Sequence, residues 1–281
     1  MRLFRAWLFA LFTFPALAVA QIPTATLAGI AHVAIRVSDL SRSRDFYQKL
    51  GFEQSFTLSK DGKISEAFFK VNDQQFIELY PQQDPSQSLG FMHLCFEATD
   101  LNALNRAYRA RGLTPTPVTR AGAGNLLFTM VGPENQNIEY TQYMPGSLHS
   151  KDQSLHLGEN RISKQIFGVS LRMEDPVAAR TFYEQQMGFH ESRNPLEPGV
   201  IPLLLPGTSG EAVAMSPGAD EILFAVPSQR HAAGQLSEAH VAFEKQNSML
   251  TVHDPDGMRL VFLTVQSETG WRLPQIPWLT R

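Results

Sequence analysis

The sequence has too few cysteines for disulfide bonds, which often stabilise proteins that lack a large core. It holds one cysteine, Cys95, in 281 residues. A disulfide within the chain is therefore excluded, and the fold must rest on its core or on bound metal. The formal net charge is −3, with no long run of either sign, which gives no electrostatic basis for binding nucleic acid or an anionic membrane surface. Beyond the N-terminus, no apolar run is long enough for a membrane helix.

The first residues have the pattern of an export signal. Two arginines precede an apolar run at 6–14, and the small residues Ala18 and Ala20 offer a cleavage site before Gln21. We therefore expect residues 1–20 to be a signal peptide. The mature protein is expected to be periplasmic or extracellular, with no membrane attachment after cleavage.

A strand–helix motif recurs along the chain. RSRDFYQKLGF at 42–52 is similar to AARTFYEQQMGF at 178–189, which has one extra residue. Asp39 and Asp175 stand where a helix N-cap is expected. Short strands with turn signals follow each helix. This pattern predicts four units of strand, helix and about three strands, and the units span 28–83, 88–145, 164–216 and 219–266.

Alternation along the strands of the first half places polar residues on one face. In the strand at 30–37, the apolar residues Val33, Ile35 and Val37 suit packing under a helix, which leaves His32 on the opposite face. The same alternation in three further strands completes a set with one member from each strand: His32, Glu78, His93 and Glu139.

These segments resemble the vicinal oxygen chelate superfamily, which includes glyoxalase I, extradiol dioxygenases, methylmalonyl-CoA epimerase and the fosfomycin and bleomycin resistance proteins. The most specific parts are IAHVAIRVSDLSRSRDFYQKLGF, FIELY, FMHLCFEATD and NIEYTQY. The resemblance covers nearly the whole mature chain. It implies an α+β fold in which four βαβββ units form two curled mixed-sheet half-barrels, with helices on the outer face.

The resemblance also implies a division of the chain. Residues 28–145 would form a metal-binding module, 146–163 a linker, 164–266 a degenerate second module and 267–281 a C-terminal tail. The second module is expected to bind no metal, because other residues fall at or near the four ligand positions: Gly168, Ala214, Glu221 and Val261.

In metal-dependent members of the superfamily, two units hold one divalent ion with ligands from their first and last strands. Carried over to this chain, the ligands are His32, Glu78, His93 and Glu139, and the ion is Zn, Ni, Fe, Mn or Co. Imidazole and carboxylate are normal ligands for such ions, and a cation would offset the cost of two buried carboxylates. Alternatively, His32 is a hydrogen-bonded core residue and Glu78 a solvated edge residue.

Several residues near these positions are candidates for contact with a substrate. Glu139 is the first choice for a general base and Glu78 the second. Arg36 could pair with a substrate carboxylate or be an ordinary surface arginine. Cys95 is expected to line the pocket as a small buried thiol, with the role of a soft metal ligand as the alternative. The same strand faces contribute three aromatic candidates for the pocket: Phe76, Tyr80 and Tyr143.

The four-ligand set favours an exported enzyme of the lyase or isomerase branch, which stabilises an oxyanion of a small oxygenated substrate through its metal. An extradiol dioxygenase is the alternative. It uses two histidines and one carboxylate, and no catalytic histidine beyond the ligands is evident in the sequence. A third possibility is a resistance-type protein that binds a ligand without turnover. Export argues against a glutathione-dependent glyoxalase. The protein is expected to be a monomer or homodimer.

Overall fold

The computed structural model describes residues 27–192, 201–207, 210–246 and 249–264. The predicted signal peptide and C-terminal tail lie outside the described residues. Within the described part of the chain, no helix has the length and apolar character needed to cross a membrane.

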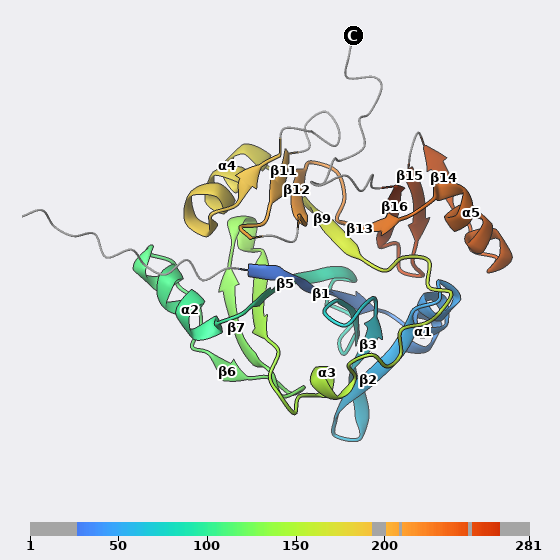
Figure 1. Ribbon diagram of the computed structural model, residues 1–281, viewed down its shortest axis with the longest axis horizontal. Helices are drawn as coiled ribbons and strands as arrows, with labels where there is room; N and C mark the ends of the chain where they lie inside the picture. The colour runs from blue at the N-terminus through green and yellow to red at the C-terminus, as the bar shows by residue number, and fades with distance from the viewer. Residues whose placement is uncertain (1–26, 193–200, 208–209, 247–248, 265–281) are drawn as a thin grey trace, which may run out of the picture.

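The chain forms two eight-stranded mixed sheets, one from each half (Figure 1). The strand order in the first sheet is 2-3-4-1-5-8-7-6, and the second sheet repeats this order with its own strands. The elements of the first half are β1 (Leu27–Val37), α1 (Leu40–Lys49), β2 (Glu53–Lys60), β3 (Lys63–Lys70), β4 (Phe76–Pro81), β5 (Gly90–Ala98), α2 (Leu101–Ala110), β6 (Thr119–Arg120), β7 (Leu126–Val131), the 3-10 helix η1 (Pro133–Asn135) and β8 (Asn137–Gln142).

The second half repeats the pattern after a short helix, α3 (Leu148–Lys151). Its elements are β9 (Ile166–Arg172), α4 (Pro176–Phe182), the π-helix η2 (Tyr183–Met187), β10 (His190–Glu191), β11 (Ile201–Leu204), β12 (Ala212–Ser216), β13 (Glu221–Val226), α5 (Gln229–Glu238), β14 (Glu244–Gln246), β15 (Met249–His253) and β16 (Arg259–Thr264). The predicted α+β fold of four repeated units is confirmed.

The helices begin where the capping residues predict. The Asp39 side chain accepts a hydrogen bond from the backbone N–H of Arg42 at 3.1 Å, and Asp175 caps α4 in the same way. The extra residue in the second copy of the motif is accommodated in η2, because a single insertion in a helix commonly produces one π turn. Gly188 then ends this helix at a φ of 81°, in the left-handed region that glycine adopts without strain.

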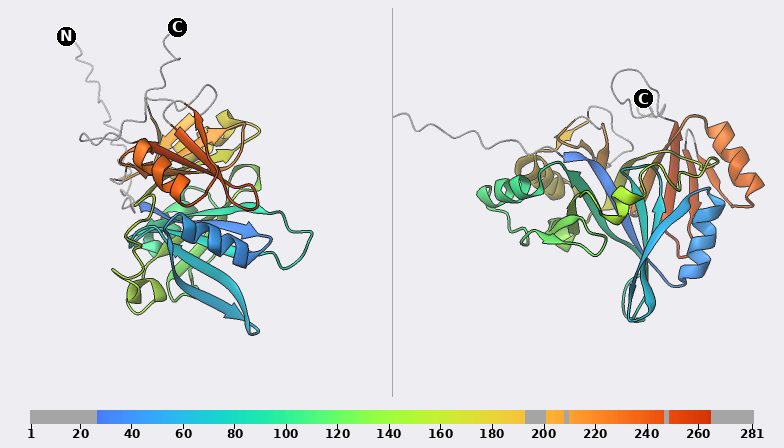
Figure 2. Two further views of the ribbon diagram at one scale, coloured as in Figure 1. Left: turned by 90° about the vertical axis from the view of Figure 1, so that its right-hand side faces the viewer. Right: turned by 60° about the horizontal axis from the view of Figure 1, so that its bottom comes forward.

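The two sheets stack on each other and share one core (Figure 2). Aromatic pairs join the halves: the rings of Phe52 and Phe224 lie 5.6 Å apart. The Gln75 side chain donates to the carbonyl of Ile166 at 2.7 Å and accepts from its N–H at 2.8 Å. This amide completes the hydrogen bonding of the backbone at the start of β9, so the second half is held against the first in a defined register.

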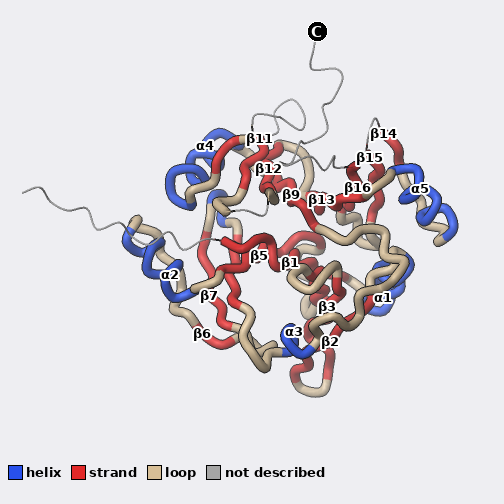
Figure 3. The backbone as a smooth tube through the Cα atoms, in the orientation of Figure 1, coloured by secondary structure: helices blue, strands red, loops and turns tan. Residues whose placement is uncertain are grey.

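The segment predicted as a linker, 146–163, carries α3, which lies between the two ends of the curled first sheet (Figure 3). On one side the N–H of Leu148 donates to the carbonyl of Ala123 at 2.9 Å. On the other side Asp152, at the C-cap of α3, pairs with Lys70 of β3 at 2.9 Å. The Lys70 side chain is fully buried and also pairs with Asp73 at 2.8 Å. The helix is therefore fastened to both walls of the sheet.

Replacing Lys70 with methionine should destabilise the protein by about 3 kcal/mol, because it takes the buried cation from Asp152, which keeps only its contact with the ring of His156. Urea denaturation followed by circular dichroism measures this change. The matched control is Lys63→Met, an exposed lysine on the same strand, for which we expect a change below about 0.5 kcal/mol. Equal stability of the two variants would show that the buried ion pair does not hold α3 in place.

Candidate metal centre

The position of His32 depends on a β-bulge in β1. Ile30 and His32 are two residues apart, which in a regular strand would place them on the same face. In the pairing with β5, however, Ile30 lies opposite Phe96 and His32 opposite Cys95, so one extra residue, Ala31, is inserted. The bulge turns the side chains to opposite faces. Ile30 therefore joins the core with Val33, and His32 enters the concave face of the sheet.

Two side chains converge on the Nε2 side of the His32 ring. Its Nε2 lies 3.1 Å from Nε2 of His93 and 3.3 Å from Oε1 of Glu139. The other oxygen of Glu139 lies 3.7 Å from Nε2 of His93. Neighbouring donors around an octahedral ion with bonds of about 2.1 Å stand about 3 Å apart. Together with His32, the two side chains therefore fit the coordination of a single divalent ion.

Glu78 lies at the other nitrogen of the same ring. Its Oε1 is 3.0 Å from Nδ1 of His32, and its Oε2 accepts a hydrogen bond from the Tyr80 hydroxyl at 3.0 Å. A carboxylate on the far nitrogen commonly orients a metal-binding histidine. Glu78 is also near enough to share an ion, because one donor atom each from His32, Glu78 and His93 lie within 4.8 Å of one another. The geometry thus allows Glu78 either role.

The charges of this cluster fit a cation. Burial would lower the pKa of His32, but the carboxylates of Glu78 and Glu139 outweigh it and raise that pKa. Burial raises the pKa of Glu78 to about 7, against the effect of His32. Burial would also raise the pKa of Glu139, but His32 and His93 outweigh it and lower that pKa. Burial lowers the pKa of His93 to about 4. The carboxyl groups of Glu78 and Glu139 are thus packed against two imidazoles, and a divalent ion held among them would stabilise their ionised forms.

The cluster opens into a cavity of about 170 Å³ on the concave face. Leu58, Phe68 and Leu127 form apolar parts of its wall. Four polar residues of the wall were not named as site candidates from the sequence: Glu66, Asn125, Thr141 and His149. Glu66 and Thr141 follow from strand alternation once the strands are placed, whereas Asn125 lies between strands and His149 in the segment that was read as a linker.

The predicted substrate-contact residues occupy different places. Tyr80 and Tyr143 line the cavity. Phe76 packs behind it, with its ring 4.8 Å from that of His149. Cys95 is fully buried beside Glu139 rather than on the wall, and burial raises the pKa of its thiol well above the ordinary value. The structure does not bring Arg36 to the cavity: its guanidinium donates to the carbonyl of Ser88 at 3.1 Å, near the end of β1.

Strand register gives the corresponding positions in the second half. The residues equivalent to His32, Glu78, His93 and Glu139 are Gly168, Ala214, Glu221 and Val261. A Cβ on Gly168 would lie 2.7 Å from the carbonyl oxygen of Ala212, so this position has no room for a histidine. Glu221 pairs with Arg259 at 2.7 Å. Ala214 and Val261 belong to a small apolar cluster with Leu223.

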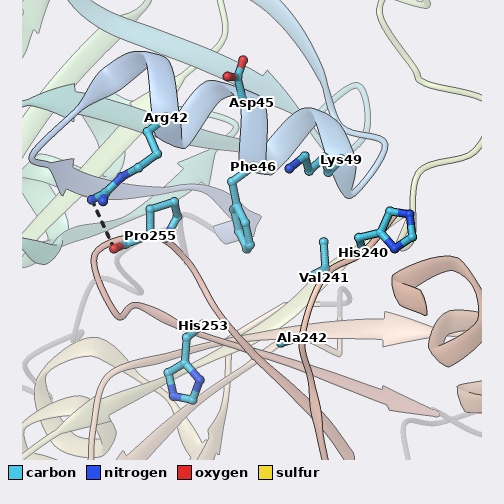
Figure 4. Close-up of a pocket in the computed structure, with 9 residues that line it drawn as sticks. All are labelled: Arg42, Asp45, Phe46, Lys49, His240, Val241, Ala242, His253 and Pro255. Atoms are coloured by element: carbon cyan, nitrogen blue, oxygen red, sulfur yellow. Dashed lines mark hydrogen bonds between the residues drawn. The ribbon is translucent and has the colours of Figure 1, made fainter. Parts of the chain in front are cut away.

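A larger groove of about 400 Å³ lies elsewhere, between α1 and the last unit (Figure 4). Phe46 and Val241 contribute its apolar surface, and Arg42 donates to the carbonyl of Pro255 at 3.2 Å. Its two histidines, His240 and His253, belong to no cluster of three or more potential metal ligands among the described residues. Among the described residues, the clustered potential metal ligands therefore lie beside the smaller cavity.

Comparison with known proteins identifies the domain that holds this centre. Residues 29–140 match the family model described as the Glyoxalase/Bleomycin resistance protein/Dioxygenase superfamily. This part of the chain is a domain of that superfamily. The match includes all four residues of the cluster, so the superfamily domain and the candidate metal centre coincide. No curated protein sequence matches the chain.

Solved structures extend the likeness over both halves. The 2,3-dioxygenase LapB from Pseudomonas sp. KL28 superposes with a TM-score of 0.69 at 16% identity, covering 90% of this chain and 96% of that one. A Mn(II)-bound glyoxalase from Novosphingobium aromaticivorans has a TM-score of 0.66 at 15% identity, covering 85% and 82%. An extradiol ring-cleaving dioxygenase from B. fuscum has a TM-score of 0.67 at 15% identity, covering 89% and 75%. At these identities the likeness shows the fold alone.

Replacing His93 with alanine should remove nearly all bound metal, because it takes one of three converging donors from the superfamily domain. Elemental analysis of protein purified without chelators or an affinity tag measures the ion. The control is His231→Ala, an exposed histidine of α5, which should bind as much metal as the unaltered protein. A full equivalent of ion in the His93 variant would show that the donors are wrongly assigned.

Proposed function

We propose that the protein is a metal-dependent enzyme of the extradiol ring-cleaving type, acting on a small neutral catechol. The observation that carries this proposal is the arrangement around His32. His93 and Glu139 meet His32 on its Nε2 side, while Glu78 occupies its Nδ1 side. Two histidines with one carboxylate are the donor set of non-haem iron(II) oxygenases.

The structure changes both arguments that the sequence offered against this reaction. Glu78 need not be a fourth ligand, because it can instead accept the hydrogen bond of the His32 Nδ1–H. A further histidine, His149, also reaches the cavity wall. With three protein ligands, an octahedral iron(II) ion would keep positions for both oxygens of a catechol and for dioxygen, and both atoms of that dioxygen would enter the ring-opened product.

The residues of the chain have separate tasks in this proposal. His32, His93 and Glu139 hold the ion. Glu78, with its carboxyl on the cavity wall and its pKa raised to about 7 by burial, is placed to take the proton of a substrate hydroxyl. Tyr80 holds this carboxyl in position through its hydroxyl. Glu139, predicted as the first-choice base, serves here as a ligand.

The size and charge of the cavity favour a single neutral ring. Its volume of about 170 Å³ is close to that of an apolar cavity of about 150 Å³ that accommodates benzene. Among the described residues of the wall there is no lysine or arginine, and Glu66 adds a third carboxyl. A substrate with its own carboxylate would therefore meet repulsion without a compensating cation.

The second candidate is the lyase or isomerase reaction that the sequence favoured. It is supported by the proximity of Glu78 to both histidines, within 4.8 Å, which allows a fourth ligand. Four protein ligands would leave two positions on a six-coordinate ion, enough for two oxygens of a substrate but not for dioxygen as well. The number of ligands thus separates oxidative from non-oxidative chemistry.

Loaded with iron(II), the protein should consume one dioxygen per catechol, measured with an oxygen electrode and by the absorbance of the ring-opened product. Catechol and 4-methylcatechol should react at least about 10-fold faster than 3,4-dihydroxybenzoate, because the carboxyl groups of the cavity wall repel a substrate carboxylate.

The Glu78→Gln variant should keep the ion and lose about 100-fold in turnover. No oxygen uptake by metal-loaded protein, combined with deuterium exchange into an α-hydroxy carbonyl compound in D₂O, would instead support the lyase or isomerase reaction.

We also propose that the enzyme works outside the cytoplasm, because of the basic, apolar and small-residue pattern of residues 1–20. N-terminal sequencing of protein from the extracytoplasmic fraction should give a chain that starts at or close to Gln21. Activity should not require glutathione, since that thiol pool is cytosolic. Recovery of intact Met1, or of the protein only from the cytosol, would contradict export.

A further inference from the structure

His149 is a buried imidazole that the ligand set does not use. It lies on α3, is 6% exposed and forms part of the cavity wall. Three phenylalanine rings meet it edge to face, with centroids 4.8 to 5.5 Å away: Phe56, Phe68 and Phe76. Tyr143 stacks on it at 4.8 Å with an interplanar angle of 23°. The ring is therefore held in one orientation.

Asn125 determines which nitrogen of this ring carries the proton. The side-chain oxygen of Asn125 accepts from the backbone N–H of Met144 at 3.1 Å, and that N–H can only donate. The NH₂ group of Asn125 must then be the end that faces Nδ1 of His149, at 2.8 Å. Because Nδ1 accepts this hydrogen bond, the neutral imidazole carries its proton on Nε2.

This Nε2–H is left without an acceptor. Nε2 is buried and has no hydrogen-bond partner among the described residues. Burial, with a smaller contribution from His32, lowers the pKa of His149 to about 3, so the ring stays neutral at ordinary pH. A buried donor without a partner is costly. Because His149 belongs to the wall of the cavity, an oxygen of a ligand bound there is the partner that we infer for it.

We propose that the Nε2–H of His149 donates a hydrogen bond to an oxygen of the substrate, and that Asn125 positions it by fixing the tautomer. The proposal rests on the proposed function only in taking this cavity as the substrate site, and it holds for either candidate reaction. The ligand it selects is ring-sized and carries an oxygen acceptor that faces α3.

The anchoring of α3 fits this role. Leu148, next to His149, is bonded to Ala123 on one wall, and Asp152, three residues further on, is paired with the buried Lys70 on the other. A donor on a helix fastened at both ends keeps its place relative to the metal ligands. Such preorganisation is what makes a single hydrogen bond selective.

The test compares two amide substitutions at this position. In His149→Gln, the amide can accept from Asn125 and still donate from near the former Nε2. In His149→Asn, the shorter amide keeps the contact with Asn125 but its nitrogen does not reach that point. The probe is 4-nitrocatechol, titrated optically into metal-loaded protein at a pH below the pKa of its more acidic hydroxyl, so that it enters the cavity uncharged. The asparagine variant should bind it about 10-fold more weakly, and the glutamine variant within about 3-fold of the unaltered protein, with equal metal content in all three.

A nitrogen-15 NMR spectrum of the ligand-free protein gives a second readout, in which His149 should be the Nε2–H tautomer. Equal binding by the asparagine variant, or the Nδ1–H tautomer, would overturn the inference on His149 and leave the proposed function standing. Absence of 4-nitrocatechol binding to the unaltered, metal-loaded protein would overturn both.

Discussion

The antiparallel pairing of β1 with β5 joins the two units of the first half, and every side chain of the candidate metal centre is placed relative to it. The pairing brings His32 and His93 together across neighbouring strands. The parallel neighbours β4 and β8 then bring Glu78 and Glu139 to the same face. The bulge at Ala31 is part of this pairing, and without it His32 and Ile30 would share a face.

The second half has the same strand pairing, but without a cluster of potential metal ligands among its described residues. β9 and β13 pair as β1 and β5 do, but the carbonyl of Ala212 approaches Gly168 too closely for a side chain. Apolar residues occupy the remaining positions, apart from Glu221, which is paired with Arg259. This half contributes to the common core and, through the hydrogen bonds between Gln75 and Ile166, holds the edge of β4 in place. Its contribution to the site is therefore indirect.

The cavity is completed by a part of the chain outside the repeated units. The helix α3 closes the space between the ends of the first sheet and supplies His149, while the loop before β7 supplies Asn125. The fully buried Lys70 connects the stability of the fold to this closure, because its partner Asp152 caps the helix. The metal ligands and His149 on the cavity wall are thus positioned by different interactions. Strand pairing positions the ligands, and a buried ion pair with an amide contact positions His149.

The sequence by itself determined the repeated units, the helix caps and the four polar residues of the concave face, because strand alternation and capping are local and repeat with a short period. It could not decide the role of Glu78, since that depends on which nitrogen of His32 the carboxylate approaches. It placed Arg36 on the correct face of the strand, but it did not show how far along the strand Arg36 lies from the cavity. It gave no sign of His149, because a segment without periodicity reads as a linker. It gave no sign of Asn125 either, because that residue lies in a loop between strands. Only the tertiary structure brings that segment across the sheet, through contacts between residues more than eighty positions apart, such as Lys70 and Asp152.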